Sequence, residues 1–250
     1  TTTPTTSSAA SDVYKRQLIK YPSKFKNRLN DLLRVVESSS FPRNQNLNAL
    51  IFIYKYNNLF NLHVLEGDFN KSIKIIPKVL DGIETNKNFI DHHHIMLLYY
   101  KIACMYFTVD DYDNCIKYLS KIMKNKNIKM REDLQCFTRV LNLIAHWEAG
   151  LDFNLDKIIK DTYNYLDKMN DLHEVQKTIL KYLKDLENIY PGEIKGFLRN
   201  LHSELKKYED DPYEKRAFLY LDIISWLESK ISNKPVQVII KEKALLINRK

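Results

Sequence analysis

Two short segments with similar residues, 43 positions apart, most constrain how this chain can fold. The first is Gly67-Asp68-Phe69-Asn70-Lys71-Ser72, and the second is Asp110-Asp111-Tyr112-Asp113-Asn114-Cys115. A related segment, Gly150-Leu151-Asp152-Phe153, follows about one repeat later. Each segment separates two stretches in which apolar residues recur at helical spacing. Because a helix pair cannot bury its apolar face alone, this repetition predicts that successive pairs cover one another and extend one core.

The apolar pattern between these turns predicts an all-α fold of stacked antiparallel helix pairs. Helical spacing is clear for Leu98, Ile102, Met105 and Tyr106, and again for Val140, Leu143, Ile144 and Trp147. The five glycines and seven prolines leave little material for the tight turns of an all-β fold. We predict helices near residues 23–38, 46–66, 69–84, 90–109, 112–125, 131–149, 153–168, 171–189, 192–208 and 212–231.

The last forty residues contain one strong helix-start signal and one ambiguous segment. Asp211-Pro212-Tyr213-Glu214 supplies an N-cap, a proline at the first helical position and a capping-box glutamate, so we expect a long helix from there to Ile231. After it, Lys234-Pro235 could begin a short helix, or Val236 to Ile240 could be extended. We therefore expect a helical repeat domain over residues 23–231 and a tail over 232–250.

The turn segments resemble those of tetratricopeptide repeats, which place Gly-Asp-Tyr at the turn and a small residue three positions after the aromatic. Ser72 and Cys115 fill that small position. Before the second turn, Tyr99, Ile102, Ala103 and Tyr106 stand where the family has an aromatic, a leucine, a small residue and a tyrosine. Before the first turn, Phe60 and His63 take the last two positions. The resemblance covers about residues 46–168, and its period exceeds the family's usual length of about 34 residues.

This resemblance implies a right-handed α-solenoid that binds a protein or peptide in a groove lined by the first helix of each pair. The implied groove residues are Tyr54, Asn57 and Asn61 in the first unit, Tyr100, Cys104 and Phe107 in the second, and Leu141, Ala145 and Glu148 in the third. Aromatic side chains there would supply large contact areas, and packing between repeats is the alternative interpretation. Asn57, Thr138 and Asn142 replace the cations of a carboxylate clamp, which excludes that subfamily.

A second candidate surface is the basic stretch from Lys117 to Arg131. It contains Lys117, Lys121, Lys124, Lys126, Lys129 and Arg131 and no acidic residue, in a chain with a net charge of +8. Such a stretch can bind phosphate backbones or an acidic partner, and a solvated helix face in a lysine-rich chain has the same composition. An RNA-associated or regulatory repeat protein is therefore the alternative function.

Signatures of catalysis and cofactor binding are missing from the sequence. It has no GxGxxG, GxxxxGK[ST], HExxH, GxSxG or paired CxxC motif, so we expect no enzyme and no cofactor. An enzyme with an unrecognised site is the third alternative. In the metal-like cluster Asp91-His92-His93-His94, adjacent histidines on a helix would point about 100° apart. We therefore expect a polar helix start with Asp91 near the N-cap, and no metal site.

Cysteine usage and the first residues bear on where the protein resides. Cys104, Cys115 and Cys136 lie in apolar stretches without CxxC spacing, which indicates buried thiols in a reducing, cytoplasmic environment. No apolar run approaches the roughly 20 residues of a membrane span, so we expect a soluble protein. The segment from Thr1 to Gln17 resembles translated sequencing-adapter read-through, so we expect residues 1–22 to be disordered or artefactual and the true N-terminus to be missing.

Overall fold

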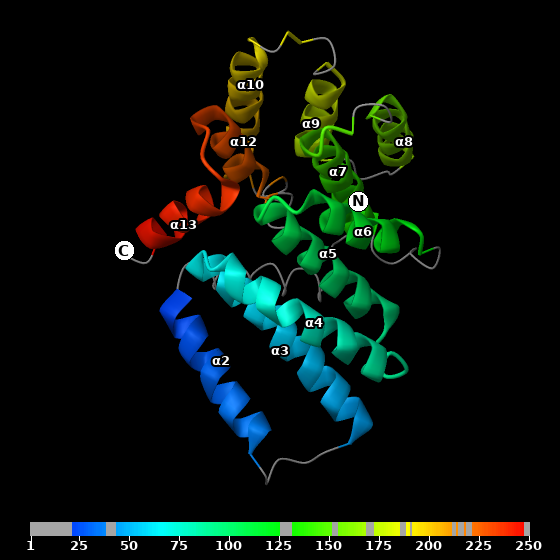
Figure 1. The fold of residues 1–250 in the computed structure, drawn as a ribbon, viewed down its shortest axis with the longest axis vertical. Helices are drawn as coiled ribbons and strands as arrows, with labels where there is room; N and C mark the ends of the chain where they lie inside the picture. Colours follow the sequence, from blue (N-terminus) through cyan, green and yellow to red (C-terminus); the bar gives the residue numbers. More distant parts are fainter. Residues whose placement is uncertain are drawn as a thin grey trace. The chain divides into compact units, whose positions relative to one another are not determined.

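Every regular element that the computed structural model describes is a helix. The described residues are 22–38, 44–125, 132–151, 155–168, 173–185, 189–190, 192–211, 214, 218 and 222–247. The helices, labelled in Figure 1, are α2 (Pro22–Glu37), α3 (Gln45–Glu66), α4 (Phe69–Asn86), α5 (His92–Thr108), α6 (Tyr112–Met123), α7 (Glu132–Glu148), α8 (Leu155–Asp167), α9 (Glu174–Asp185), α10 (Ile194–Lys206), α12 (Ile223–Ser232) and α13 (Val236–Ile247). The all-α prediction is confirmed for these residues. Residues 1–21 lie outside them, so the expectation for the N-terminal segment stays a prediction.

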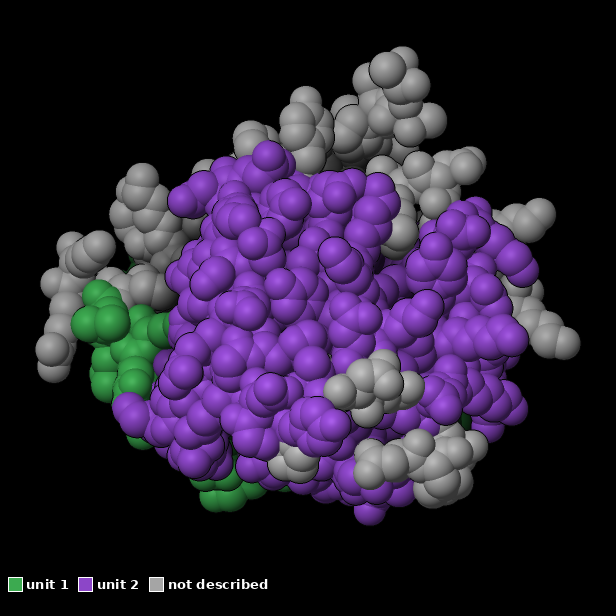
Figure 2. Space-filling model, turned by 90° about the horizontal axis from the view of Figure 1, so that it is seen from above, with its two compact units in different colours: residues 1–98, 240–250 green, residues 99–239 purple. Residues whose placement is uncertain are grey.

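The chain forms two compact units, which are coloured separately in Figure 2. Unit 1 comprises residues 1–98 and 240–250, and unit 2 comprises residues 99–239. The boundaries fall inside α5, between Leu98 and Tyr99, and inside α13, between Ile239 and Ile240. Unit 1 therefore takes its helices from two distant parts of the chain.

In unit 1, α3 packs against α2 on one side and α4 on another (Figure 1). The α2–α3 core consists of Phe25, Leu29 and Leu62, with Leu33, Leu59 and Leu65 packed around it. Ion pairs of 2.6 Å join Lys26 to Glu66 and Lys55 to Glu37, so the two helices run antiparallel. On the α4 side, a Cβ at Gly82 would overlap the Phe52 ring. This glycine lets the two helices approach closely.

In unit 2, α7 is the central helix. It contacts α6, α8 and α9, and between Leu134 and Ala145 only Arg139 retains appreciable exposure. A helix that is buried on nearly all faces must find partners for its polar side chains. Accordingly, Thr138 donates to the Leu134 carbonyl at 2.7 Å, and Gln135 donates to the Ile122 carbonyl of α6 at 3.0 Å. Beyond this group, α10 packs against α12 and α9.

The three repeated segments begin with the same backbone conformation. Gly67, Asp110 and Gly150 have φ values of 66°, 60° and 66°, in the left-handed region. After each helix, the N–H of this residue donates to the carbonyl three positions earlier, and the next N–H donates to the carbonyl five positions earlier. These bonds satisfy the carbonyls that a helix leaves without partners at its end. The repetition read from the sequence is therefore a repetition of local structure.

The helix that follows each of the first two turns begins in the same way. The side chains of Asp68 and Asp111 accept hydrogen bonds from the N–H groups of Lys71 and Asn114, at 3.3 Å and 3.1 Å. Such N-caps satisfy a donor that the first helical turn leaves free. The small residues Ser72 and Cys115, three positions into each helix, are both fully buried. A bulkier side chain there would push the helix from its neighbour.

One predicted helix differs from the structure. Asp222 is an N-cap whose side chain accepts from the Ser225 N–H at 3.0 Å, so α12 begins at Ile223 and the expected continuous helix from 212 to 231 is wrong. Residues 212–213, 215–217 and 219–221 lie outside the described part. In the tail, the helical alternative is confirmed by α13 (Val236–Ile247). The other predicted bounds agree with the observed ones to within four residues.

None of the helices in the described part of the chain combines the length and the apolar character that crossing a membrane requires.

Candidate functional site

The predicted groove residues divide into exposed and buried groups. Tyr54 on α3 is 54% exposed, and Asn57 and Asn61 on the same helix are partly exposed. Cys104 is also partly exposed, whereas the side chain of Glu148 is only 8% exposed. Four others, Tyr100, Phe107, Leu141 and Ala145, are at most 5% exposed. The α7 members are buried because neighbouring helices cover almost all of that helix. These four side chains therefore belong to the core as the fold stands.

The three predicted residues on α3 share one face of that helix, in unit 1, with the exposed Leu50. Leu50, Tyr54, Asn57 and Asn61, here called the α3 face, follow one another at intervals of four, three and four residues, which places them on one side of a helix. Leu50 is 47% exposed. The Asn57 Oδ1 atom has no hydrogen-bond partner among the described residues. An aliphatic, an aromatic and two amide side chains thus line this face.

Three residues of the basic stretch form a second surface in unit 2. Lys117 and Lys121 lie on α6 and Lys124 follows it, and all three side chains are exposed. Lys126, Lys129 and Arg131 lie outside the described residues. Within the described part of the chain, these three ammonium groups, here called the α6 lysine face, have no carboxylate within ion-pair distance. Other lysines do, for example Lys207 with Glu204 at 2.6 Å.

A cluster of three tyrosines supports the α6 lysine face. The Tyr118 ring is stacked on Tyr106 of α5, with centroids 5.8 Å apart and planes 4° apart, and Tyr99 lies 5.8 Å from it. The Lys121 Nζ lies 5.0 Å from the Tyr99 ring centroid and 5.3 Å from that of Tyr118. Burial raises the pKa of both Tyr106 and Tyr118, so these phenols stay neutral and do not offset the lysine charges.

Glu148, a predicted groove residue, instead joins two helices of unit 2. Its Oε1 accepts a hydrogen bond from Trp226 Nε1, and its Oε2 lies 2.5 Å from Lys230 Nζ. The Trp226 ring is 1% exposed and meets Trp147 edge-on at 5.8 Å. Glu148 thus connects the end of α7 to α12 across 78 to 82 residues of sequence. Both of its oxygens are occupied by structural partners.

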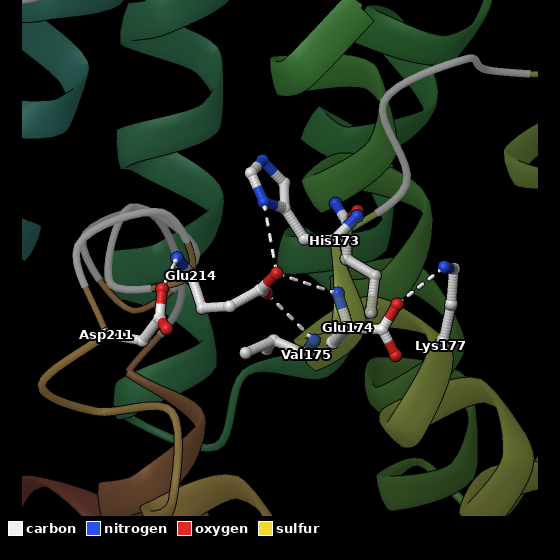
Figure 3. A network of polar contacts seen from close by, with 7 residues as sticks. His173, Glu174, Val175, Lys177, Asp211 and Glu214 are labelled. Carbon is white, nitrogen blue, oxygen red and sulfur yellow. Dashed lines mark hydrogen bonds and ion pairs between the residues drawn. The ribbon is translucent and has the colours of Figure 1, made fainter.

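Glu214 has a similar role at the N-terminus of α9 (Figure 3). Its carboxylate accepts hydrogen bonds from the N–H groups of Glu174 and Val175, both at 3.0 Å, and lies 3.7 Å from His173 Nδ1. Asp211 accepts from the Glu214 N–H at 3.0 Å, as the sequence predicts for an N-cap. The capping-box glutamate, however, caps a helix 40 residues away. A carboxylate is stabilised there by the free N–H groups and the helix dipole.

The Asp91–His94 cluster is a helix start. Asp91 Oδ1 accepts from the His94 N–H at 2.9 Å, and its Oδ2 lies 2.7 Å from His94 Nδ1. Burial raises the pKa of Asp91, but the hydrogen bonds from His94 outweigh that effect and lower it overall. In the described ranges, no group of three or more His, Cys, Asp or Glu side chains is placed to hold a metal ion. The capping role expected for Asp91 is confirmed.

Comparisons with known proteins found no matching family model, no matching curated protein and no matching solved structure. Among the site residues predicted from the sequence, the exposed ones that the structure describes belong to the α3 face and the α6 lysine face.

Proposed function

We propose that this chain is a non-catalytic scaffold that binds a segment of another protein. The observation that carries the proposal is the α3 face, where Leu50 and Tyr54 are about half exposed beside Asn57 and Asn61. Aromatic side chains contribute much of the energy of protein interfaces, and amides can bind the backbone of an extended peptide. The α3 helix is also the first helix of its pair, which is where tetratricopeptide-like arrays bind their ligands.

The free acceptor of Asn57 supports the same assignment. A buried polar atom without a partner costs about 1–3 kcal/mol. A small movement of the Asn57 side chain would let its Oδ1 accept a hydrogen bond from the N–H of a bound peptide. Binding would then supply a bond that the free α3 face lacks.

The structural use of three carboxylates supports the non-catalytic part of the proposal. The carboxylates of Asp91, Glu148 and Glu214 all bind helix ends or neighbouring helices. A general acid or base must instead be within reach of a substrate proton. These groups are committed to holding the fold together.

Site-specific photo-crosslinking tests this function. A photoreactive phenylalanine analogue replaces Tyr54 on the α3 face or, as a control, Tyr163, which is 56% exposed on α8. We expect the Tyr54 position to yield discrete protein adducts from cell extract that the Tyr163 position does not yield. In a direct binding assay with the captured partner, Tyr54→Ala should weaken affinity by about 1–3 kcal/mol.

Two results would reject the proposal. One is an identical set of adducts from both positions, which would mean that Tyr54 only meets abundant proteins at random. The other is a captured partner whose affinity is unchanged in Tyr54→Ala and in Asn57→Ala, because the α3 face would then contribute no binding energy.

A further inference from the structure

We propose that the α6 lysine face binds an acidic segment of a partner polypeptide. This inference rests on the proposed protein-binding function and adds a second contact surface, on the second helix of a pair, in unit 2. Lys117, Lys121 and Lys124 follow one another at intervals of four and three residues. With about 1.5 Å of rise and 100° of rotation per residue, their Cα atoms lie on one helix face and span about 10 Å.

The charge on this face lacks an internal counter-charge. Asp113 is the acidic residue of α6, in its first turn, and no ion pair joins it to Lys117. Elsewhere in the described chain the exposed lysines Lys71, Lys177 and Lys207 each pair with a carboxylate three residues away. A row of uncompensated lysines attracts a partner that carries the opposite charge.

The tyrosine cluster holds part of this row in place. Lys121 Nζ lies over two rings, at 5.0 Å from the centroid of Tyr99 and 5.3 Å from that of Tyr118. Lys117 Nζ lies 5.8 Å from the Tyr118 centroid. A long side chain that is already restrained loses less conformational entropy when it forms an ion pair. Binding at this face therefore costs less than binding by fully free lysines.

The same cluster favours a polypeptide over a nucleic acid. Single-stranded nucleic acids gain affinity when their bases stack on open aromatic faces. Here Tyr118 is only 4% exposed and stacked against Tyr106, and the Lys121 ammonium lies over the rings of Tyr99 and Tyr118. The α6 lysine face also contains no arginine, the residue that suits bidentate phosphate binding. The α6 lysine face presents a row of ammonium groups at intervals of four and three residues. Acidic side chains at the same intervals on a partner helix would lie opposite them.

Two lysines of unit 1 provide a matched control. Lys74 and Lys78 lie seven and eleven residues after Gly67, and Lys117 and Lys121 lie seven and eleven residues after Asp110. The control pair on α4 is also exposed, but Ile75 stands there at the position of Tyr118. Reversing either pair changes the net charge equally. Only one of the two reversals removes lysines that are restrained by tyrosines.

The test uses the full chain and a fluorescein-labelled helical peptide with glutamates at intervals of four and three residues. Fluorescence anisotropy at about 0.15 M salt should show that Lys117→Glu with Lys121→Glu raises Kd at least about tenfold. The Lys74→Glu and Lys78→Glu pair should change Kd less than about threefold. A peptide with glutamine in place of glutamate should not bind, and unlabelled single-stranded RNA should compete poorly. Far-UV circular dichroism confirms that each variant is folded.

Several outcomes would overturn the inference. Equal losses in the two charge-reversal variants would mean that binding depends only on net charge. Tighter binding of RNA than of the acidic peptide would assign the face to nucleic acid. No binding by the wild-type chain at micromolar concentrations would remove the site. None of these outcomes affects crosslinking at Tyr54 in unit 1, so the proposed function and this inference can fail separately.

Discussion

At the scale of single residues, the first two repeats place different side chains at equivalent positions. In the first, His63 Nδ1 lies 2.9 Å from the Ser72 hydroxyl, and both residues are buried. In the second, Tyr106 and Cys115 take these positions. Burial lowers the pKa of His63, an effect that Glu66 partly offsets, because the charged imidazolium loses hydration inside the unit. The first repeat therefore contains a histidine, whose ordinary pKa of about 6.5 lies near neutrality, where the second has a tyrosine whose pKa burial raises.

We predict that unit 1 loses stability as the pH falls, through His63. A neutral histidine with a lowered pKa contributes fully above its unfolded-state pKa of about 6.5. Below that pH the unfolded chain binds a proton that the folded chain still excludes, so the free energy of unfolding decreases until the lowered pKa is passed. His63→Asn retains a polar atom near the position of Nδ1 but does not titrate. Urea unfolding at pH 7.5 and 5.0 should therefore show a smaller loss in this variant than in the wild type.

His202→Gln is the control for this measurement. It removes a histidine of unit 2, 3.3 Å from Glu228, and leaves the buried His63 of unit 1 in place. If His63→Asn and the wild type lost the same free energy between the two pH values, the buried imidazole would have no part in the pH dependence.

At the scale of elements, two turns with the same backbone conformation have different packing around them. Gly67 and Gly150 share a φ of 66° and the same hydrogen bonds. Their surroundings differ, because a Cβ on Gly67 would lie 2.7 Å from the Lys241 Cα of α13, whereas a Cβ on Gly150 would have no heavy atom of the described residues within 4 Å. Position 67 therefore requires glycine both for its left-handed backbone and for the close contact with Lys241, whereas position 150 requires it only for the backbone.

We predict that Gly67→Ala destabilises the protein more than Gly150→Ala. An alanine in the left-handed region costs about 1–2 kcal/mol, and this is the whole expected effect at position 150. At position 67 the backbone of α13 must also move, so the total should exceed the value at position 150 by about 1 kcal/mol or more. Thermal and urea unfolding of the two variants gives the comparison. Equal losses would mean that the contact with Lys241 contributes nothing.

The sequence predicts those features of the elements that depend on neighbouring residues. A left-handed turn requires glycine or a small polar residue, and an N-cap requires an acceptor such as Asp68, so both can be recognised within a few positions. The helix that Glu214 caps could not be recognised in this way, because the N–H groups that it binds on α9 are 39 and 40 residues away. Nothing in the local pattern distinguishes a capping-box glutamate from one that caps another helix. The expected helix over residues 212–231 was wrong because Asp222 caps a helix that begins only at Ile223.

The same distinction applies to the candidate surfaces. The lysines of α6 are visible in the sequence as a run without acidic residues. The tyrosine cluster that supports these lysines is not visible in the sequence. Tyr99, Tyr106 and Tyr118 come together only when α5 and α6 pair. Likewise, whether Tyr54 or Tyr100 faces solvent depends on which neighbouring helices cover α3 and α5, and a repeat pattern alone does not specify that.

At the scale of the whole molecule, the chain does not fold as two consecutive pieces. Unit 1 includes the part of α13 from Ile240 onward, since residues 240–250 belong with residues 1–98. Within this part, Ile240 and Ala244 are buried and the Lys241 backbone lies against Gly67. The stability of the α3–α4 turn should therefore depend on residues that lie far from it in the sequence.

We predict that a chain truncated after Ile239 loses protection from hydrogen exchange in unit 1. Peptides covering residues 60–75 should exchange about tenfold faster or more, because α13 no longer covers the α3–α4 turn. Peptides covering α6, in unit 2, should keep their wild-type rates. Leu245→Ser with Leu246→Ser is the matched control, because these side chains are 52% and 62% exposed and their replacement removes little packing. A similar rise in exchange for α6 and for residues 60–75 would mean that the two units open together, whereas unchanged exchange at residues 60–75 would mean that unit 1 is stable without its C-terminal helix.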